Sequence, residues 1–553
     1  MEDFGMWDSL VPVDPSRAAE YYRRGWWRHE TFADDLAGHV RERPQATALI
    51  SYQQGEPSRT LSYTELGGLT ERFAGALIEL GVGKRDVVVA HLPNWWMLTP
   101  LYLACARIGA VIAPLLPAMG DRELGHVLRT SGAKVCIVAS EYAGTDFGKR
   151  LLDVAPGTLA HRVVVGDAGA TGAIDFGKFF TDTPWEERHP VTGLPRPDPD
   201  DVALLVFTSG TTGQPKAVAH TFNTLFAASR AFSDIYGLSA QDVVLIPHFL
   251  THLAGSDYAI CMSVALGATC VMQDTMDMGL LLDLVAAHAV TLVFAAPVFM
   301  KGIVAAQRET PRDISSLRYL NSSSAPIPPW LVGAVREVLG LRLDSNFGMT
   351  ECGAITITRA GDPVDWAAHS DGSAVDWTEV RIDAGPGERV GRLLTRGASQ
   401  CLGYVGQRDA YTECLDADGW FDTGDMARAD GRGGIRITGR RTDLIVRSSA
   451  LKVPALEVET VLESHPAINE VILVGYPDPV APEADRVCAV VVAQGAAPSL
   501  PELTRFLAEQ QMTELYWPDR LEVVPELPRN PQGKVLRRAL RDLATEDSGG
   551  QQA

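Results

Sequence analysis

Residues 202–216 read VALLVFTSGTTGQPK, an apolar run of strand length that leads directly into a turn of hydroxyl-bearing residues, glycines and one lysine. Backbone N–H groups in such a glycine-rich turn can converge on a phosphate, and the hydroxyls and the lysine add further donors. The stretch lacks the adjacent Gly-Lys-Ser/Thr of a P-loop. By itself it is therefore consistent with a phosphate cradle or with an ordinary polar turn after a strand.

Strand-like and helix-like segments alternate on both sides of this stretch. Segments such as 63–81 carry apolar residues at helical spacing. Apolar runs rich in valine and isoleucine occupy 86–93, 133–140, 161–167, 242–247, 268–274 and 290–297. This alternation predicts an α/β fold in which parallel or mixed sheets are covered by helices.

The pattern changes from about residue 380, where short alternating strands with glycine-rich turns predict a small antiparallel, β-barrel-like subdomain. Beyond GRRTD (439–443), helical and strand patterns form a compact α+β segment. We therefore expect a large N-terminal domain (1–438), a hinge (439–443), a small C-terminal domain (444–545) and a disordered tail (546–553).

The composition is that of an ordinary globular protein, 46% hydrophobic and 21% charged. A net charge of −20 argues against a nucleic-acid-binding surface. Eight scattered cysteines without a C-x-x-C pair favour free thiols in a reducing compartment over a zinc site. The N-terminus lacks a signal-peptide pattern, and Pro100 and Arg107 interrupt the most apolar stretch (95–118), which favours a buried helix and strand over a membrane span. We expect a cytoplasmic protein.

Five further motifs follow the turn: SSSAPIP (322–328), NFGMTE (346–351), GWFDTGDMA (419–427), GRRTD (439–443) and NPQGK (530–534). In this order, the glycine-rich turn and these five motifs resemble the signatures of the adenylate-forming superfamily. This superfamily contains acyl- and aryl-CoA ligases, luciferases and peptide-synthetase adenylation domains. GASQCLGY, ITGRRTDLIVR and YWPDRLEVV resemble in particular the cyclohexanecarboxylate-type and medium-chain acyl-CoA ligases. The resemblance implies attack of an acid oxygen on the α-phosphorus of ATP, which gives an acid-AMP anhydride and pyrophosphate.

The resemblance also implies roles for single residues. The leaving phosphates would be held by Thr208, Ser209, Gly210, Thr211, Thr212 and Gly213, with the catalytic Lys216 nearby. The rest of the nucleotide would contact Ser324, Ala325, Pro326, Asn346, Phe347, Gly348, Asp425, Ile437 and Arg440. Thr350 and Glu351 would lie at the α-phosphate, where the carboxylate binds Mg²⁺, an ion that prefers hard oxygen ligands. Lys534 matches the catalytic lysine of a mobile C-terminal domain, which must close over the larger domain.

One departure from the family pattern concerns the acid. In SSSAP, Ser323 and Ser324 stand where glycines normally let adenine and acid lie close. The resemblance places the acid pocket at His252, Asp257, Ser323 and Met349. A buried carboxylate needs a partner, so we expect Asp257 to pair with a structural His or Arg; alternatively it faces a substrate amine or hydroxyl. These polar residues at the acid pocket favour a small or polar acid as substrate over a long fatty acyl chain.

A second departure concerns the acceptor. Ser449 stands where the family has the glycine that lines the tunnel for the pantetheine thiol of CoA, Ser448 precedes it, and Thr442 replaces Lys or Asp at the hinge. These changes are either neutral drift or signs of another acceptor.

Two enzymatic hypotheses therefore stay open. The first, favoured by the resemblance, is an acid–CoA ligase that uses ATP, Mg²⁺ and CoA. The second passes the activated acid to an amine, and one version is an ATP-dependent diazotase that activates nitrite for an aryl amine in bacterial secondary metabolism. A non-catalytic nucleotide-binding protein is disfavoured, because Glu351, Asp425 and Lys534 are all intact. The acid, the acceptor and the oligomeric state stay open.

Overall fold

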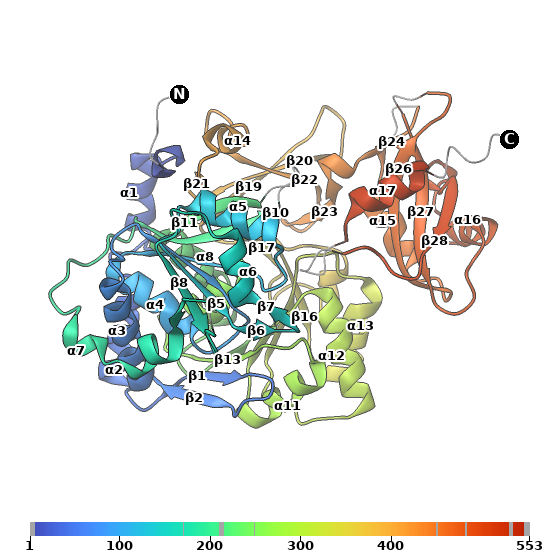
Figure 1. Cartoon of the computed structure of the whole chain (residues 1–553). Helices are drawn as coiled ribbons and strands as arrows, with labels where there is room; N and C mark the ends of the chain where they lie inside the picture. The colour runs from blue at the N-terminus through green and yellow to red at the C-terminus, as the bar shows by residue number, and fades with distance from the viewer. Residues whose placement is uncertain are drawn as a thin grey trace.

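Two units of unequal size make up the fold in Figure 1, a large α/β unit and, after β23, a small unit drawn in red. The structure is a computed structural model that describes residues 6–169, 171–209, 215–247, 249–448, 452–481, 484–529 and 535–546. Within these ranges, no helix is long and apolar enough to span a membrane.

One sheet of the large unit has nine strands in the order β18-β17-β16-β15-β14-β12-β13-β1-β2. The six strands from β16 to β1 run parallel to one another. Their bounds, with those of the antiparallel edge strands, are β1 Thr47–Tyr52, β2 Arg59–Ser62, β12 Val243–Leu245, β13 Thr269–Gln273, β14 Leu292–Phe294, β15 Tyr319–Ser322, β16 Leu343–Met349, β17 Gly353–Ile357 and β18 Ser373–Ala374. Three helices cover its outer face: α11 Met278–His288, α12 Pro297–Glu309 and α13 Pro329–Leu339.

The second sheet has eight strands in the order β21-β11-β10-β4-β3-β5-β8-β9. The strands from β10 to β9 are parallel, whereas β11 and β21 are antiparallel to their neighbours. The bounds are β3 Val87–His91, β4 Val111–Pro114, β5 Val135–Ala139, β8 His161–Val165, β9 Ile174–Asp175, β10 Val202–Ser209, β11 Pro215–Thr221 and β21 Gly403–Tyr404. Its outer face packs against α5 Asp121–Ser131 and α6 Phe147–Val154.

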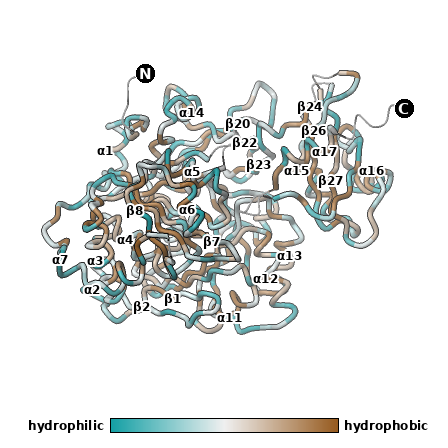
Figure 2. The backbone as a smooth tube through the Cα atoms, in the orientation of Figure 1, coloured by the Kyte–Doolittle hydropathy of each residue, from teal (hydrophilic) through white to brown (hydrophobic). Residues whose placement is uncertain are grey.

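The largest hydrophobic core contains residues of both sheets together with α3 Tyr63–Glu79, α4 Leu98–Ile108 and α8 Phe222–Tyr236. In β3, Val88 and Ala90 face this core, whereas Val87 and Val89 face the outer core. Because both faces of the parallel strands are buried, their sequences are continuously apolar, and Figure 2 shows them brown. Each apolar run predicted as a strand forms one, and the stretch 95–118 forms α4 and β4, so the predicted α/β fold is confirmed.

Shorter elements complete the large unit. Before β10 these are η1 Met6–Ser9, α1 Pro15–Arg23, α2 Phe32–Glu42, β6 Glu141–Tyr142, β7 Thr145–Asp146, η2 Gly177–Asp182 and α7 Trp185–Arg188. After β12 they are α9 Leu253–Gly255, η3 Ser256–Cys261, α10 Met262–Leu266, η4 Trp366–Ala368 and α14 Arg408–Thr412. A separate antiparallel sheet contains β19 Thr378–Asp383, β20 Val390–Gly397, β22 Phe421–Ala429 and β23 Ile435–Arg440.

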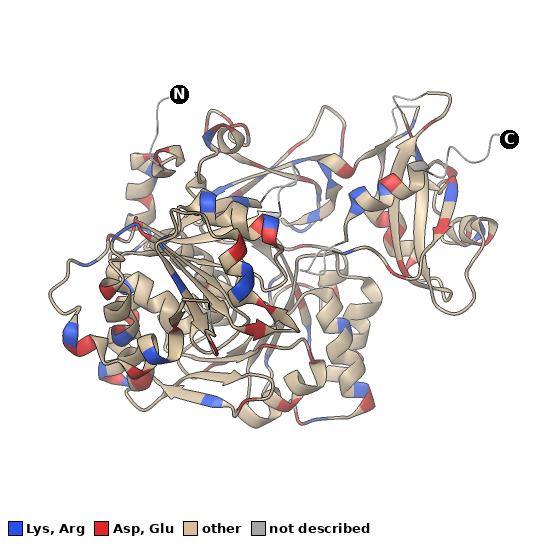
Figure 3. Cartoon of the chain, in the orientation of Figure 1, with Lys and Arg blue, Asp and Glu red and all other residues tan. Residues whose placement is uncertain are grey.

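The small unit follows β23 and the short helix η5 Arg441–Asp443. Its elements are β24 Ile445–Val446, β25 Lys452–Val453, α15 Ala455–Leu462, β26 Ile468–Pro477, β27 Asp485–Ala493, α16 Leu500–Glu509, η6 Glu514–Tyr516, β28 Arg520–Val523 and α17 Arg537–Glu546. Helices α15 and α16 pack on the three-stranded sheet β26-β27-β28 through the unit's own apolar core. Figure 3 shows acidic and basic residues interspersed over both units.

Candidate active site

The two ends of the stretch TSGTTGQPK lie on paired antiparallel strands. Strands β10 and β11 are antiparallel, with Thr208 opposite Lys216 and Ser209 opposite Pro215. Of the predicted phosphate-binding residues, Gly210, Thr211, Thr212 and Gly213 lie outside the described residues. After the undescribed residues the chain continues as strand β11, which lies between β10 and β21 and is buried along almost its whole length.

Three side chains from distant segments meet beside this pair of strands. The Nζ atom of Lys216 lies 4.5 Å from the centre of the Tyr404 ring. The Tyr404 hydroxyl donates a hydrogen bond of 2.8 Å to Oε1 of Glu351. Burial and the nearby Glu351 carboxylate raise the pKa of Tyr404, which keeps its hydroxyl protonated as a donor. Tyr404 was not predicted as a site residue, although GASQCLGY contains it, because only the pairing of β21 with β11 brings it to Lys216.

His220 anchors the turn that carries Thr350 and Glu351. It lies on the same strand face as Lys216, four residues further along β11, and is fully buried. Its Nε2 atom lies 2.7 Å from the Thr350 carbonyl oxygen, and its Nδ1 atom lies 3.0 Å from Oγ1 of Thr224. Burial lowers the pKa of His220 to about 4, so the neutral ring donates from Nε2 and accepts at Nδ1. His220 is therefore a positioning residue that the sequence did not reveal.

The NFGMTE motif crosses from the end of β16 into the turn before β17. Asn346 is buried, and Phe347 packs between two small apolar clusters. A Cβ at Gly348 would lie 2.4 Å from the Gly353 carbonyl oxygen, so this position accepts only glycine without a backbone shift. Met349 and Thr350 are partly buried at the end of the strand. The strand thus brings the adenine-side and phosphate-side residues of the motif to one edge of the sheet.

The SSSAP loop follows β15, with Ser323 buried and Ser324, Ala325 and Pro326 exposed. Ser324 has a φ of 75°, in the left-handed region that glycine adopts without strain. The backbone therefore adopts a conformation that glycine takes without strain, although a serine stands there. Such strain is typical of binding loops.

Ser324→Gly should increase the free energy of unfolding by about 1 kcal/mol, because it removes the left-handed strain of a Cβ-bearing residue. Ser323→Gly is the matched control: the φ of Ser323 is not positive, so the added chain freedom should lower stability by about 0.5 kcal/mol. Urea unfolding of the three proteins measures both effects. Equal changes in the free energy of unfolding for the two variants would contradict the assignment of backbone strain to Ser324.

Asp425 and Arg440 lie opposite each other on β22 and β23. Nε of Arg440 lies 2.9 Å from Oδ1 of Asp425. The Asp425 backbone N–H also donates to Oγ1 of Thr423, at 3.1 Å. Asp425 is only 5% exposed, so its carboxylate is held in one place and can accept hydrogen bonds from a pair of neighbouring hydroxyls.

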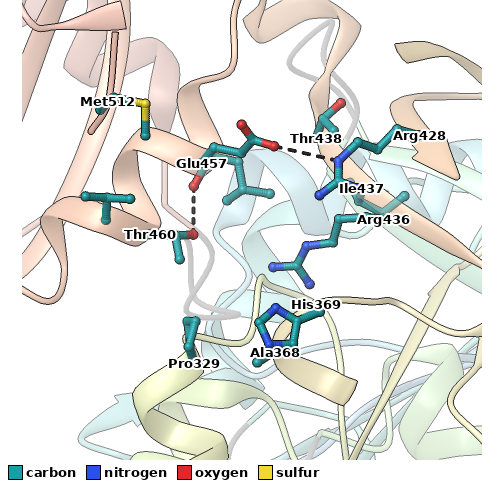
Figure 4. Close-up of a pocket in the computed structure, with 12 residues that line it drawn as sticks. Pro329, Ala368, His369, Arg428, Arg436, Ile437, Thr438, Glu457, Thr460 and Met512 are labelled. Carbon is teal, nitrogen blue, oxygen red and sulfur yellow. Dashed lines mark hydrogen bonds and ion pairs between the residues drawn. The ribbon is translucent and has the colours of Figure 1, made fainter. Parts of the chain in front are cut away.

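Ile437 lies where the two units meet. Its backbone N–H donates to Oδ2 of Asp371 at 2.8 Å, and its side chain lines a pocket of about 290 Å³ between β22, β23 and helix α15 (Figure 4). Arg428 and Glu457 form an ion pair of 3.6 Å across this boundary.

Of the predicted hinge and tunnel residues, Thr442 and Ser448 are exposed. Ser449 lies outside the described residues, as does the predicted catalytic Lys534.

Asp257 does not form the ion pair expected from the sequence. It is fully buried in the π-helical segment η3, and neither carboxylate oxygen has a hydrogen-bond partner among the described residues. Burial raises the pKa of the carboxyl well above its usual value. A charged carboxylate is costly to bury without a partner, so burial favours the protonated form. His252 is partly buried, and its desolvation lowers its pKa to about 4, so it does not carry the countercharge.

Asp257→Asn should stabilise the protein increasingly as the pH rises. The unfolded Asp257 ionises near its ordinary pKa of about 4, whereas the folded group keeps its proton to a higher pH. The free energy of unfolding of the wild type therefore decreases as the pH rises from the pKa of the unfolded state to that of the folded state. The asparagine variant has no group that titrates here, so its stability does not decrease in this way. Thermal unfolding should show a Tm gain of a few degrees at pH 8 and a smaller one at pH 5. A gain independent of pH would show that Asp257 is ionised in the fold.

The acidic groups of the site fit a magnesium ion held largely by its substrate. Within the described ranges, no three His, Cys, Asp or Glu side chains cluster as metal ligands. Mg²⁺ is usually bound by one or two carboxylates together with substrate phosphates. The Glu351 carboxylate, 9% exposed and oriented through one oxygen by Tyr404, meets this requirement.

Comparisons with known proteins agree with this organisation. The family model of the AMP-binding enzyme matches residues 36–405, and that of the AMP-binding enzyme C-terminal domain matches residues 457–534. The salicyl-AMP ligase / salicyl-S-ArCP synthetase of Mycobacterium tuberculosis is 32% identical over 550 residues, covering 96% of this chain and 94% of that protein. The medium-chain fatty-acid–CoA ligase of Escherichia coli is 29% identical over 541 residues, covering 96% and 93%. The solved structure of the amide bond synthetase McbA from Marinactinospora thermotolerans superposes with a TM-score of 0.80 at 25% identity, covering 93% of this chain and 99% of that one.

Proposed function

Because the chain belongs to the AMP-binding enzyme family and is an AMP-forming ligase, we propose that it uses ATP to activate a small or polar acid as an acid-AMP anhydride. Pyrophosphate is the leaving group. The anhydride is then passed to an acceptor, for which the thiol of CoA is the first candidate.

The observation that carries the proposal is the meeting of Lys216, Tyr404 and Glu351 beside the paired strands β10 and β11. Lys216 would neutralise negative charge on the leaving phosphates, and Glu351 would be the carboxylate that holds a magnesium ion. The bound ion would supply further charge neutralisation of the phosphates. His220 keeps the Thr350 carbonyl in place, so the turn does not have to reorganise during the reaction.

The remaining assignments follow the motifs. We propose that Asp425 accepts the ribose hydroxyls, that Phe347 stacks on adenine and that Lys534 bridges the acid and the α-phosphate. Residues 444–545 would then act as a unit that turns at 439–443 and closes over the large unit. The boundary formed by Arg428 and Glu457 is where such a motion would begin.

The second candidate acceptor is an amine, including the version in which nitrite is activated and passed to an aryl amine. Two observations favour it: Ser449, preceded by Ser448, stands where a tunnel glycine is expected, and the chain resembles an amide bond synthetase as well as CoA ligases. The Asp257 carboxyl, which has no hydrogen-bond partner among the described residues, would give the acid pocket a polar group that a fatty acyl chain does not need.

The test incubates the protein with ATP, Mg²⁺ and a panel of acids that includes nitrite, with either CoA or an aryl amine. Release of AMP and pyrophosphate with at least one acid is expected, and its absence with every acid would refute acid activation. Product formation that requires CoA and ordinary carboxylates would exclude the diazotase. Turnover with nitrite and an amine alone would exclude the CoA ligase.

A further inference from the structure

Three buried aromatic side chains form a cluster close to the segment that follows the Thr350–Glu351 turn. Tyr258 of η3 meets Phe232 of α8 edge to face at 4.5 Å, and Phe294 at the end of β14 at 5.8 Å. Phe232 and Phe294 lie 5.3 Å apart. All three are at most 3% exposed. We call these residues the aromatic triad.

The aromatic triad lies where the substrate-binding motifs leave the sheet. Phe294 is the last residue of β14 and pairs with Asn321, which leads into the SSSAP loop. Strands β14, β15 and β16 are parallel, so their carboxyl ends share one edge, the edge at which α/β folds bind ligands. The triad therefore lies at the edge of the sheet from which the SSSAP and NFGMTE motifs leave.

Tyr258 is held in place at both ends. Its hydroxyl accepts a hydrogen bond of 3.0 Å from the backbone N–H of Ala354, three residues after Glu351. Its ring is fixed by the two edge-to-face contacts. The turn is tightly packed on this same side: a Cβ at Gly353 would lie only 2.7 Å from the Ala228 side chain and 3.8 Å from the Tyr258 hydroxyl. Neither the ring nor the turn can therefore move aside without losing several contacts.

We propose that the aromatic triad closes the interior behind the acid group and restricts the enzyme to acids of only a few heavy atoms, the size of nitrite, formate or acetate. The inference rests on the proposed acid activation and narrows its substrate class. An acid whose carboxyl or nitrite oxygen faces the α-phosphate beside Glu351 meets the Tyr258 side chain behind it. A longer acyl chain or an aryl ring would have to displace Tyr258 and leave the buried Ala354 N–H without its acceptor.

The experiment measures ATP–pyrophosphate exchange with nitrite, formate, acetate, butyrate, hexanoate and benzoate at equal concentrations. Wild type should exchange at least about tenfold faster with its best small acid than with hexanoate or benzoate. Tyr258→Ala should reduce that ratio by about tenfold, because it opens the space behind the acid. Tyr258→Phe, which keeps the ring, should retain the ratio.

Two further variants keep the test decisive. Tyr258→Leu removes less volume and covers the case in which the alanine variant does not fold. Phe180→Ala, a fully buried ring in a different aromatic cluster, should lower stability without changing the preference among acids. Equal exchange by wild type with acetate and hexanoate, or an unchanged ratio in folded Tyr258→Ala and Tyr258→Leu, would overturn the inference and leave acid activation intact. No exchange with any acid would instead refute the proposed function.

Discussion

Glu351→Gln is expected to lower the rate of ATP–pyrophosphate exchange by about 100- to 1000-fold, the size of effect seen when a preorganised charge-stabilising group is removed from an active site. The amide oxygen of the new side chain would still accept the hydrogen bond from Tyr404, so the local geometry is retained while the negative charge is lost. The loss therefore reports on the charge that holds Mg²⁺. Exchange should be measured over a titration of Mg²⁺, whose apparent affinity should fall together with the rate.

Two controls separate this effect from general damage. Tyr404→Phe removes only the orienting hydrogen bond and should cost about tenfold or less, because such a bond contributes about 1 kcal/mol. Glu337→Gln changes an exposed carboxylate that faces Arg308 on the surface and should leave exchange unchanged. If Glu351→Gln kept the wild-type rate at saturating Mg²⁺, the assignment of Glu351 to the metal would be wrong.

Asp425→Ala is expected to raise the KM for ATP by about 10- to 100-fold, which corresponds to loss of a hydrogen bond to a charged group. The carboxylate is 5% exposed and held by Arg440 and the β22–β23 register, so its oxygens are fixed at the position proposed for the ribose. Removal also leaves Arg440 without this ion pair. Initial rates over a range of ATP concentrations, at a fixed acid concentration, give the KM.

2′-Deoxy-ATP provides the internal control for Asp425. Wild type should lose affinity for this analogue, because one ribose hydroxyl is missing, whereas Asp425→Ala should discriminate much less between the two nucleotides. Urea unfolding of the variant shows whether the protein is intact. A folded Asp425→Ala protein with an unchanged KM for ATP would place the ribose elsewhere.

Local patterns in the sequence predicted the architecture well. The run 202–207 and its counterparts became strands because continuous Val and Ile suit parallel strands buried on both faces, and α3 appeared where apolar residues recur at helical spacing. The family signatures likewise lie in short segments, so the sequence could propose Glu351 and Asp425 as site residues. The expected His or Arg partner of Asp257 is not found among the described residues, and the neighbours of a buried group depend on segments far away in the chain.

The sequence by itself determined the α/β fold, the order of its motifs and the membership of an AMP-forming family, since all three rest on residues that are close along the chain. Only the tertiary structure decided which groups complete the site. Tyr404 reaches Glu351 across 53 residues, and His220 reaches the Thr350 carbonyl across 130. Tyr258 likewise meets Phe232 and Phe294 only through the packing of η3 on α8 and β14. Such contacts form when strands pair and helices pack, and no local spacing encodes them.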